Sequence, residues 1–404
     1  MVRGRDFVIV GLTPYDVEFG SNCKNIAEEI AKHNRVLYIN RPVDRASLIT
    51  RRNNPSMQKR IAINKGEKED LVQVSENLWN LYPKTVMESV NWLNINSIFD
   101  YINKVNNQRL ANKILGAIER LGFKDFILFN DNDFFKGYHL KELLQPSQYV
   151  YYIRDYLVGL KYWAKHGERM EKKLIGKADV VVTNSTYLSQ YAEAYNHKVF
   201  YVGQGCDLSH FKERAGVGAP EDLQNIQSPV VGYVGALNSH RLDISILEYI
   251  ADNMPEWNLV LVGPEDENFQ KSSLHKRKNV HFLGNKSIQE LPQYIQRFDV
   301  CLNPQLVNAL TIGNYPRKID EYLAMGKPSV ATKTKAMEVF KDHVYLANSK
   351  EEYVQLIRKA YNEFTDDRAN MLKAFAATHT WENSVRGIYN AILAVERFEY
   401  ALAV

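Results

Sequence analysis

A polar turn that runs into a short helix carries the residue spacing with the clearest chemical meaning. Residues 308–328 read NALTIGNYPRKIDEYLAMGKP. Pro316 suits the first turn of a helix, and the Gly-Lys-Pro that follows would stop it, so we expect a helix over 316–325. The free amides at the start of such a helix form a site for an anion such as phosphate.

Two side chains of this expected helix project from the same side. Lys318 and Glu321 are three residues apart, a spacing that makes two side chains neighbours on a helix. A cation for a phosphate beside a carboxylate for ribose hydroxyls is suited to a nucleotide. The spacing leaves an ordinary surface ion pair open as the alternative.

Three expected strands in the same half each end in a glycine turn. The strands cover 230–234, 259–262 and 280–283. Glycine lets the backbone approach a phosphate or a base closely, and an arginine beside it adds a bidentate donor for a diphosphate. Each turn taken alone is equally consistent with a tight connection. The residues of these turns that are candidates for binding such a ligand are Gly235, Asn238, Arg241, Gly263, Leu283 and Gly284.

The first half offers carboxylates at strand ends. A reaction at a hydroxyl group calls for a general base, and the candidates at strand ends are Asp16, Asp131, Asp133 and Asp155. Asp155 stands just after an apolar run at 150–153, and Asp16, in the loop after the first strand, is the second choice. Because Arg154 precedes Asp155, a structural ion pair between the two is the alternative interpretation.

The elements that must position these residues alternate between short apolar strands and amphipathic helices. Continuous apolar runs such as 7–10 and 36–39 are typical of parallel strands that are covered on both faces. The pattern restarts after a linker at 216–220. We therefore expect an α/β chain of two Rossmann-like, doubly wound domains, with a ligand crevice at the carboxyl ends of their strands. The expected bounds are 1–208 and 209–380 for the domains and 381–404 for a closing helix.

The composition limits the class of protein and its compartment. The chain has 404 residues, three scattered cysteines and no apolar run of the roughly 20 residues that a membrane span needs, so we expect a cytoplasmic enzyme. Residues 41–66 hold seven basic residues and one acid. This stretch predicts either a solvated loop or a peripheral contact with the anionic inner face of a membrane. Nucleic-acid motifs with interleaved aromatics are missing, so no nucleic-acid partner is expected.

The second half resembles the donor domain of GT-B glycosyltransferases, in particular bacterial family-four-like enzymes and those of teichuronic acid and exopolysaccharide synthesis. The resemblance is carried by VGYVG at 231–235, LVGP at 261–264, VHFLG at 280–284 and PRKIDEYLAMGKP at 316–328. It covers residues 170–335 well and residues 1–60 and 120–170 loosely. It implies the GT-B fold, in which two Rossmann-like domains face a cleft and a C-terminal helix crosses back onto the first.

The resemblance also implies a reaction. A sugar would pass from a nucleotide-sugar, expected to be UDP-linked, to a cell-envelope polysaccharide or lipid-linked acceptor, without a metal or other cofactor. Glu321 matches the second acid of the family's Glu-x7-Glu motif and would bind the ribose hydroxyls, with Lys318 and Arg241 at the diphosphate. Gly313 stands where the first acid would be. The contacts of that acid would pass to the amides of Gly313 and Asn314, or to Thr311.

In the first domain the resemblance places Gly20 and Ser21 near the acceptor. Arg154 replaces the histidine of the family's His-Asp pair, whose aspartate is Asp155, and would also contact the acceptor or donor sugar. Three alternatives stay open. The Asp-Asn-Asp at 131–133 has the spacing of the metal site of the other glycosyltransferase fold, GT-A. The chain could also be a nucleotide-sugar epimerase of the same fold, or a two-domain binding protein without catalysis.

Overall fold

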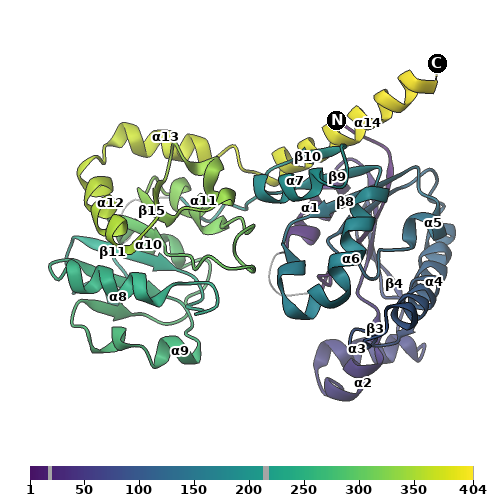
Figure 1. The fold of residues 1–404 in the computed structure, drawn as a ribbon, viewed down its shortest axis with the longest axis horizontal. Coiled ribbons are helices and arrows are strands. Elements are labelled where there is room, and N and C mark those ends of the chain that lie inside the picture. Colours follow the sequence, from purple (N-terminus) through teal and green to yellow (C-terminus); the bar gives the residue numbers. More distant parts are fainter. Residues whose placement is uncertain (17–20, 213–217, 404) are drawn as a thin grey trace. The chain divides into compact units, whose positions relative to one another are not determined.

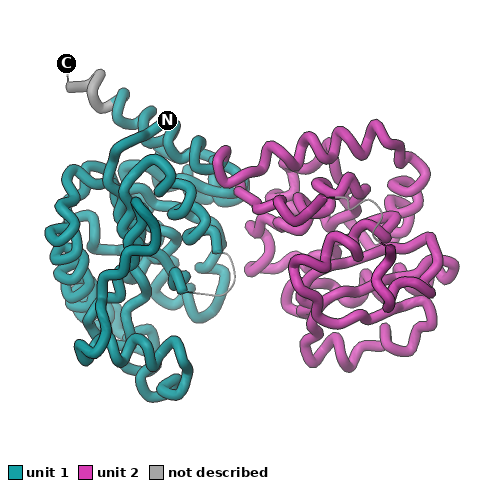
Figure 2. Tube along the Cα trace, turned by 180° about the vertical axis from the view of Figure 1, so that it is seen from behind, with its two compact units in different colours: residues 1–203, 384–404 teal, residues 204–383 magenta. Residues whose placement is uncertain are grey.

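The chain folds into two α/β units, as Figures 1 and 2 show. The structure, a computed structural model, describes residues 1–16, 21–212 and 218–403. Unit 1 comprises Met1–Gly203 and Ser384–Val404, and unit 2 comprises Gln204–Asn383. Each unit has its own sheet and core, and the predicted pair of doubly wound α/β domains is confirmed.

The sheet of unit 1 has the strand order β10-β9-β8-β7-β1-β2-β5-β4. The pairs are parallel except β4 with β5. The strand order reverses between β1 and β7, so the loops after these two strands diverge. The strands are β1 (Asp6–Gly11), β2 (Arg35–Ile39), β4 (Leu71–Ser75), β5 (Leu78–Leu81), β7 (Ile127–Asp131), β8 (Gln148–Ile153), β9 (Val180–Thr183) and β10 (Val199–Tyr201), and β3 (Val43–Asp44) pairs separately with β6 (Val86–Met87).

Helices cover both faces of this sheet. The helices are α1 (Asn22–Ala31), α2 (Arg45–Thr50), α3 (Pro55–Asn64), α4 (Asn96–Leu121), α5 (Leu140–Leu144), α6 (Lys161–Lys177), α7 (Thr186–Glu193) and α14 (Trp381–Ala403). Val8 belongs to a buried cluster with Leu110 of α4. Its neighbour Phe7 faces the other way, and its ring centroid lies 6.3 Å from that of Tyr389 in α14. The expected return of the closing helix to the first domain is therefore confirmed.

The sheet of unit 2 is fully parallel in the order β13-β12-β11-β14-β15-β16. Its strands are β11 (Val230–Val234), β12 (Asn258–Val262), β13 (Val280–Phe282), β14 (Val300–Asn303), β15 (Ser329–Thr332) and β16 (Tyr345–Ala347), and its helices are α8 (Ile244–Asn253), α9 (Glu267–Gln270), α10 (Leu291–Arg297), α11 (Arg317–Ala324), α12 (Lys350–Asn362) and α13 (Asp366–Ala376). Val230 packs with Ile319 of α11 on one face, and Val231 packs with Ile250 of α8 on the other.

The boundary between the units differs slightly from the expected one. The amide of Cys206 donates to the carbonyl of His379 over 2.9 Å, and Cys206 also forms a β-bridge with Thr380. Residues 204–208, which we expected to close the first domain, therefore belong to unit 2. The expected linker at 216–220 lies partly outside the described residues. Among the helices of the described ranges, none combines the length and the apolar character that crossing a bilayer requires.

Candidate functional site

The candidate site of unit 2 lies where its strand order reverses. β11 and β14 are neighbours in the sheet, but the helices that follow them, α8 and α11, pack on opposite faces. Loops that leave a parallel sheet in opposite directions at its carboxyl edge leave room for a ligand between them. The residues that sequence analysis singled out at 235–241 and 311–321 follow these two strands.

Two glycines let the loops after β11 and β12 run against each other. Gly235 and Gly263 have φ of +134° and +149°, values that other residues rarely adopt. The Gly235 amide donates to the carbonyl of Val262 over 2.9 Å. A Cβ atom on Gly263 would overlap the carbonyl oxygen of Gly235. Glycine is therefore required at Gly263 by a close backbone approach as well as by its dihedral angle.

The ammonium group of Lys318 lies over this crossing. It donates a hydrogen bond to the hydroxyl of Tyr233, and it lies 4.0 Å from the centroid of that ring. The Cβ position of Gly235 is 3.1 Å from Lys318 Nζ. Because Tyr233 is itself buried in β11, the lysine is held at the glycine turn as a fixed positive charge.

Glu321 follows Lys318 by one turn of α11 and is half-buried. Burial raises the pKa of its carboxyl group, and the positive charges of Arg317 and Lys318 oppose that rise. Its carboxylate oxygens accept no hydrogen bond from other side chains in the part of the chain that the structure describes. The group is thus a polar acceptor with capacity for a ligand.

Arg241 belongs to a loop that is tied to the segment before α11. The amide of Leu306 donates to the Arg241 carbonyl over 2.8 Å, and Asn308 Nδ2 donates to the carbonyl of His240 over 2.9 Å. Asn238 closes the turn from within, since its carbonyl accepts from the Arg241 amide over 2.9 Å. The Arg241 side chain is exposed. Asn238 therefore has a structural role, and the exposed side chain of Arg241 is available to bind an anion.

The turn before α11 uses most of its polar groups internally. The hydroxyl of Thr311 is buried and donates to the carbonyl of Leu306, and the Asn314 amide donates to the Thr311 carbonyl over 3.0 Å. Gly313 is buried too. Of the three groups expected to replace the missing acid, two are thus committed to the shape of the loop. α11 itself begins at Arg317, with Pro316 at the N-cap position.

Leu283 and Gly284 lie at the end of β13, an edge strand, and not at the strand reversal. The Leu283 amide donates to the carbonyl of Leu261 over 2.9 Å, and its side chain packs partly into the core. Gly284 is exposed, with φ of +67°. Since β12 separates β13 from β11, these two residues can line only the outer part of a ligand site along the same edge.

In unit 1 the strand reversal is occupied by Arg154. Its Nε donates to Asp131 Oδ1 over 2.8 Å, its Nη1 to Asp155 Oδ2 over 2.7 Å and its Nη2 to Thr13 Oγ1 over 3.4 Å. Asn132 Oδ1 accepts from the amides of both Arg154 and Asp155, over 3.0 and 2.9 Å. The ion pair between Arg154 and Asp155 is therefore observed, and their role at a substrate stays a prediction. The side chain of Asp155 keeps 38% of its surface exposed.

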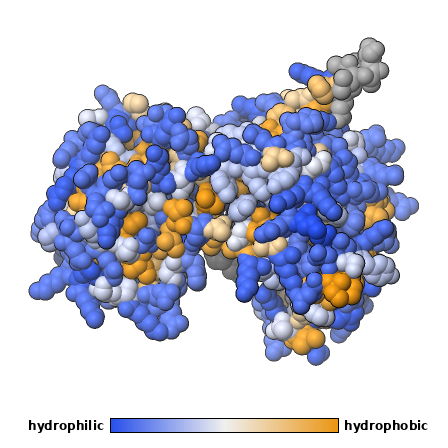
Figure 3. Space-filling view, in the orientation of Figure 1, coloured by the Kyte–Doolittle hydropathy of each residue, from blue (hydrophilic) through white to orange (hydrophobic). Residues whose placement is uncertain are grey.

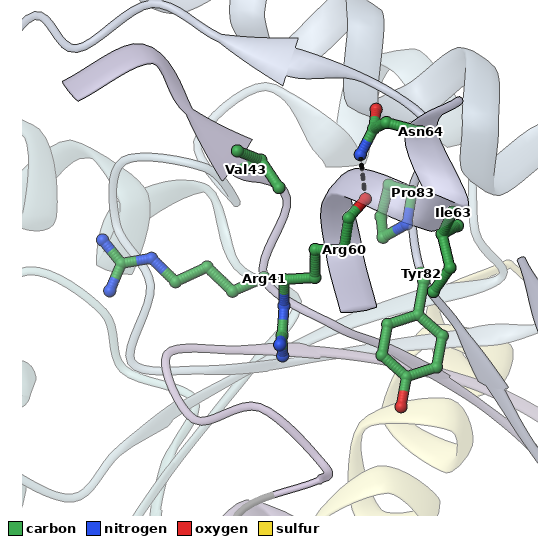
Figure 4. A pocket seen from close by; sticks show the side chains of 7 residues that line it. All are labelled: Arg41, Val43, Arg60, Ile63, Asn64, Tyr82 and Pro83. Carbon is green, nitrogen blue, oxygen red and sulfur yellow. Dashed lines mark hydrogen bonds between the residues drawn. The ribbon is translucent and has the colours of Figure 1, made fainter. Parts of the chain in front are cut away.

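Asp16, the second candidate base, is held by cations. Its carboxylate lies 2.7 Å from Arg60 Nη2 and 3.5 Å from Lys59 Nζ, and it accepts from the hydroxyl of Tyr82 over 3.2 Å. Burial acts to raise the pKa of Asp16, but the two cations outweigh it and the pKa is lowered. Such a carboxylate is a weak proton acceptor. Asp155 pairs with one cation, Arg154, and its side chain is more exposed than that of Asp16 (38% against 19%), so Asp155 stays the first candidate. Arg60 and Tyr82 also line a small pocket with Arg41, Val43, Ile63, Asn64 and Pro83 (Figure 4).

The acceptor candidates Gly20 and Ser21 fall at the start of α1. Gly20 lies outside the described residues. Ser21 is the N-cap of α1, and its hydroxyl accepts from the amide of Lys24 over 3.2 Å. The structure thus supports the simple capping role for Ser21 that its position before a helix also allows.

The Asp-Asn-Asp at 131–133 does not form an open pair of carboxylates. Asp131 is buried against Arg154, whereas Asp133 is buried against Lys136, with Asp133 Oδ2 2.6 Å from Lys136 Nζ. Each acid therefore has its own cation. Within the described ranges, no group of three or more His, Cys, Asp and Glu side chains is arranged to hold a metal ion.

Sequence analysis missed a polar junction behind α11. Asp320 is fully buried, and its carboxylate lies 2.6 Å from His379 Nδ1 and accepts from Cys206 Sγ over 3.1 Å. The tyrosine hydroxyl of Tyr315 also contacts His379 Nδ1, at 3.1 Å. His379 and Cys206 lie 59 and 114 positions from Asp320 along the chain, so spacing gave no signal for this junction. The junction fixes α11, and with it Lys318 and Glu321.

Comparisons with known proteins agree with this architecture. Residues 228–363 match the family described as glycosyl transferases group 1. A stretch of 170 residues is 28% identical to the teichuronic acid biosynthesis glycosyltransferase TuaH of Bacillus subtilis, covering 40% of this chain and 42% of that protein. The chain therefore spans less than half the length of that curated relative.

Two solved structures share the fold over nearly the whole chain. Anabaena HepE, solved in complex with UDP, superposes with a TM-score of 0.65 at 16% identity, over 96% of this chain and 100% of that one. Sucrose-phosphate synthase from Thermosynechococcus elongatus gives 0.63 at 16% identity, over 99% and 100%. Residues 228–363 thus resemble the glycosyl transferases group 1 family, and the whole chain has the GT-B fold of glycosyltransferases.

Proposed function

We propose that the chain is a glycosyltransferase that takes a sugar from a nucleotide-sugar held by unit 2 and passes it to a hydroxyl group of a cell-envelope glycan or a lipid-linked acceptor. The observation that carries the proposal is the fixed charge of Lys318 over the crossing of the Gly235 and Gly263 loops. A positive charge beside close backbone turns, at the strand reversal of a parallel sheet, is suited to a diphosphate.

The leaving group of the reaction is a nucleoside diphosphate, which departs from the anomeric carbon of the sugar as the acceptor oxygen attacks. Its growing negative charge is stabilised by Lys318, by Arg241 and by the first-turn amides of α11, and this arrangement needs no metal. Glu321 accepts from the ribose hydroxyls. Asp155 is assigned to the acceptor hydroxyl, with Arg154 orienting its carboxylate.

Two similarities support the choice of substrates. HepE was solved with UDP, which supports a UDP-linked donor. TuaH is named for teichuronic acid biosynthesis, which supports an envelope polysaccharide as the product. The proposed diphosphate site rests on the residues of unit 2, and these two similarities support only the choice of nucleotide and acceptor.

A thermal-shift comparison of UDP, GDP, ADP and CMP tests the donor part of this proposal. One nucleoside diphosphate should raise the unfolding temperature in a concentration-dependent way, because a ligand that binds only the folded state stabilises it by mass action. CMP, which lacks the second phosphate, should shift the temperature less. Equal shifts by all four, or none, would remove the diphosphate site.

Incubation of the full chain with the matching nucleotide-sugar tests the reaction. The expected result is release of the nucleoside diphosphate, with the sugar transferred to an acceptor hydroxyl or, when no acceptor is present, to water. Recovery of an isomerised nucleotide-sugar, without release of the nucleotide, would instead identify an epimerase of the same fold.

A further inference from the structure

Large apolar side chains are exposed in unit 1 on the segments where α2, α4 and α6 begin. The group consists of Ile49, Trp92, Ile95, Ile98, Tyr101 and Tyr162, called here the α2–α4–α6 surface, with exposed fractions between 44% and 78%. Figure 3 shows hydrophobic patches in the part of unit 1 where α2 and α3 lie in Figure 1. Single exposed apolar residues are common, but a group on adjoining segments marks an interaction surface.

Hydrogen bonds show that these segments adjoin one another. The Ala46 amide in α2 donates to Ser89 Oγ over 3.1 Å. Asn91 Nδ2 donates to the carbonyl of Tyr162 over 2.6 Å, and Lys165 Nζ donates to the carbonyl of Trp92 over 2.7 Å. Residues 89–95 therefore bridge α2 to the start of α6 and lead directly into α4.

The inner side of the same segments is firmly held. The ring of His166 stacks on Phe99 with centroids 3.8 Å apart, and its Nε2 lies 2.9 Å from the carbonyl of Leu93. Arg169 makes two hydrogen bonds to Asp100, of 2.7 and 2.9 Å. Since α4 is fixed by this side, Ile95, Ile98 and Tyr101, at every third position, are displayed on the other.

The charge around the surface is net positive. Residues 44–52, 88–101 and 161–165 hold five basic residues and three acids. Each acid already has a partner, since Asp44 accepts from Ser47 and Ser89, Glu88 pairs with Arg45 and Arg109, and Asp100 pairs with Arg169. Arg51, Arg52 and Lys161 are exposed and have no carboxylate partner in the part of the chain that is described. By contrast, two basic residues later in the 41–66 stretch, Lys59 and Arg60, form ion pairs with Asp16.

We propose that the α2–α4–α6 surface binds an anionic lipid bilayer. Tryptophan and tyrosine are enriched at the membrane–water interface, and aliphatic side chains beside them bury in the boundary between headgroups and acyl chains. Arginine and lysine residues without partners are attracted to anionic headgroups. The combination of exposed aromatics with unpaired cations on a rigid support favours a bilayer over a protein partner. This inference goes beyond the proposed function, because it states where the protein works and rests on none of the donor-site residues.

Co-sedimentation of the full chain with lipid vesicles tests the proposal. We expect the protein to pellet with vesicles of phosphatidylcholine mixed with phosphatidylglycerol, and much less with phosphatidylcholine alone. R51E/R52E should lower the partition coefficient by about thirtyfold or more, because each cation near an anionic surface contributes about fivefold. I98S should lower it by about tenfold, because an isoleucine side chain is no longer buried in the interface.

Matched variants at exposed residues outside the α2–α4–α6 surface provide the controls. Leu115 lies further along α4 and is 39% exposed, similar to Ile98 at 44%, so L115S should bind vesicles like the wild type. K113E/K124E changes the net charge as much as R51E/R52E does, at exposed residues outside the surface, and should have a small effect. Circular dichroism and the unfolding temperature report whether each variant is folded.

Three results would overturn the proposal. The first is a wild-type protein that does not pellet with anionic vesicles. The second is equal loss of binding in L115S and I98S, or in the two double charge variants. The third is a dimer in gel filtration that W92A dissociates while vesicle binding is unchanged, which would assign the surface to a second copy of the chain.

Discussion

At the scale of single residues, the position of Lys318 decides whether unit 2 can hold a diphosphate. Lys318→Ala should weaken binding of the matching nucleoside diphosphate by about thirtyfold or more, because a charge-assisted contact of about 2 kcal/mol is lost. Isothermal titration calorimetry measures this directly. The fold should be intact, since the lysine is held by one tyrosine of β11 and fills no part of the core.

Lys350 supplies the matched control for this variant. It also lies over a tyrosine ring, 5.0 Å from the centroid of Tyr249, but it stands at the start of α12. Lys350→Ala should bind the nucleotide like the wild type. Equal weakening in the two variants would mean that the effect comes from a general loss of charge and not from a site at Lys318.

Glu321 gives nucleotide binding a dependence on pH. Burial raises the pKa of this carboxyl group, so it takes up a proton at a higher pH than an exposed glutamate does. If ribose hydroxyls donate to the ionised form, affinity should fall as the pH drops through this raised pKa. Glu321→Gln should bind roughly tenfold more weakly at neutral pH and lose this slope.

Titrations of the nucleotide into the wild type, E321Q and E338Q, from neutral to acidic pH, test this pH dependence of affinity. Glu338 is exposed and pairs with Lys341 outside the site, so E338Q should keep the wild-type slope. A slope that survives in E321Q would show that another group is responsible for it.

Local sequence identified these candidate residues, yet it could not show which groups they contact. Arg241 stands out because it follows a glycine turn, and Lys318 stands out because it is three residues before Glu321 on an expected helix. The pairing of Arg154 with Asp131 joins residues 23 positions apart on neighbouring strands, and no periodicity encodes it. For the same reason the Asp-x-Asp spacing suggested a metal, whereas the fold gives each of its acids a separate cation.

At the scale of elements, the loops after β11 and β12 depend on Gly263. Gly263→Ala should lower the free energy of unfolding by about 3 kcal/mol or more, because a Cβ atom would overlap the Gly235 carbonyl in addition to the strained dihedral angle. Gly284→Ala is the control, since its φ of +67° is also positive but its Cβ position is open. It should cost only about 1 kcal/mol. Denaturant titration of both variants measures the difference, and equal losses would argue against the close approach.

Glu171 joins three elements of unit 1. In α6 it accepts hydrogen bonds from Tyr151 of β8 and Tyr191 of α7, over 2.9 and 3.1 Å. Burial raises the pKa of Glu171 to about 7. Between the ordinary glutamate pKa and that value, the folded protein holds a proton that the unfolded chain has lost, so stability falls as the pH rises through this range.

Glu171→Gln should therefore flatten the dependence of stability on pH. The wild type should lose roughly 3 kcal/mol of unfolding free energy from this group between mildly acidic and neutral pH. The variant should not show that loss, because glutamine keeps the shape without the charge. Glu193→Gln, at an exposed position of α7, should follow the wild-type curve. Chemical denaturation at several pH values distinguishes the three proteins.

Elements were predictable where burial dominates the sequence pattern. β1, β2 and β11 are largely apolar runs because both of their faces are covered, and these runs alone predict their positions. β4 is an edge strand with four exposed residues of five, so it has no apolar run to detect. α10 begins at Leu291, after Ser287 and Glu290 form a hydrogen-bonded turn.

At the scale of the whole molecule, two units with separate cores should respond separately to a ligand. Saturating UDP, or whichever diphosphate the thermal-shift screen selects, should raise the unfolding temperature of unit 2 and leave that of unit 1 unchanged. At a concentration of 100 Kd the stabilisation is about 2.7 kcal/mol. Calorimetry combined with hydrogen exchange, read peptide by peptide, assigns each transition. Protection confined to residues 1–203 would contradict the placement of the donor.

The β-bridge between Cys206 and Thr380 has a consequence for engineering and for evolution. The bridge holds the two ends of residues 204–383 together, so this segment is an insertion in unit 1 whose ends already touch. A segment with such ends can be exchanged as a cassette between positions 203 and 384 without stretching the host. Under the proposed function, donor preference could then be combined with a different acceptor-binding unit by a single graft. Removal of residues 384–403 would instead damage unit 1.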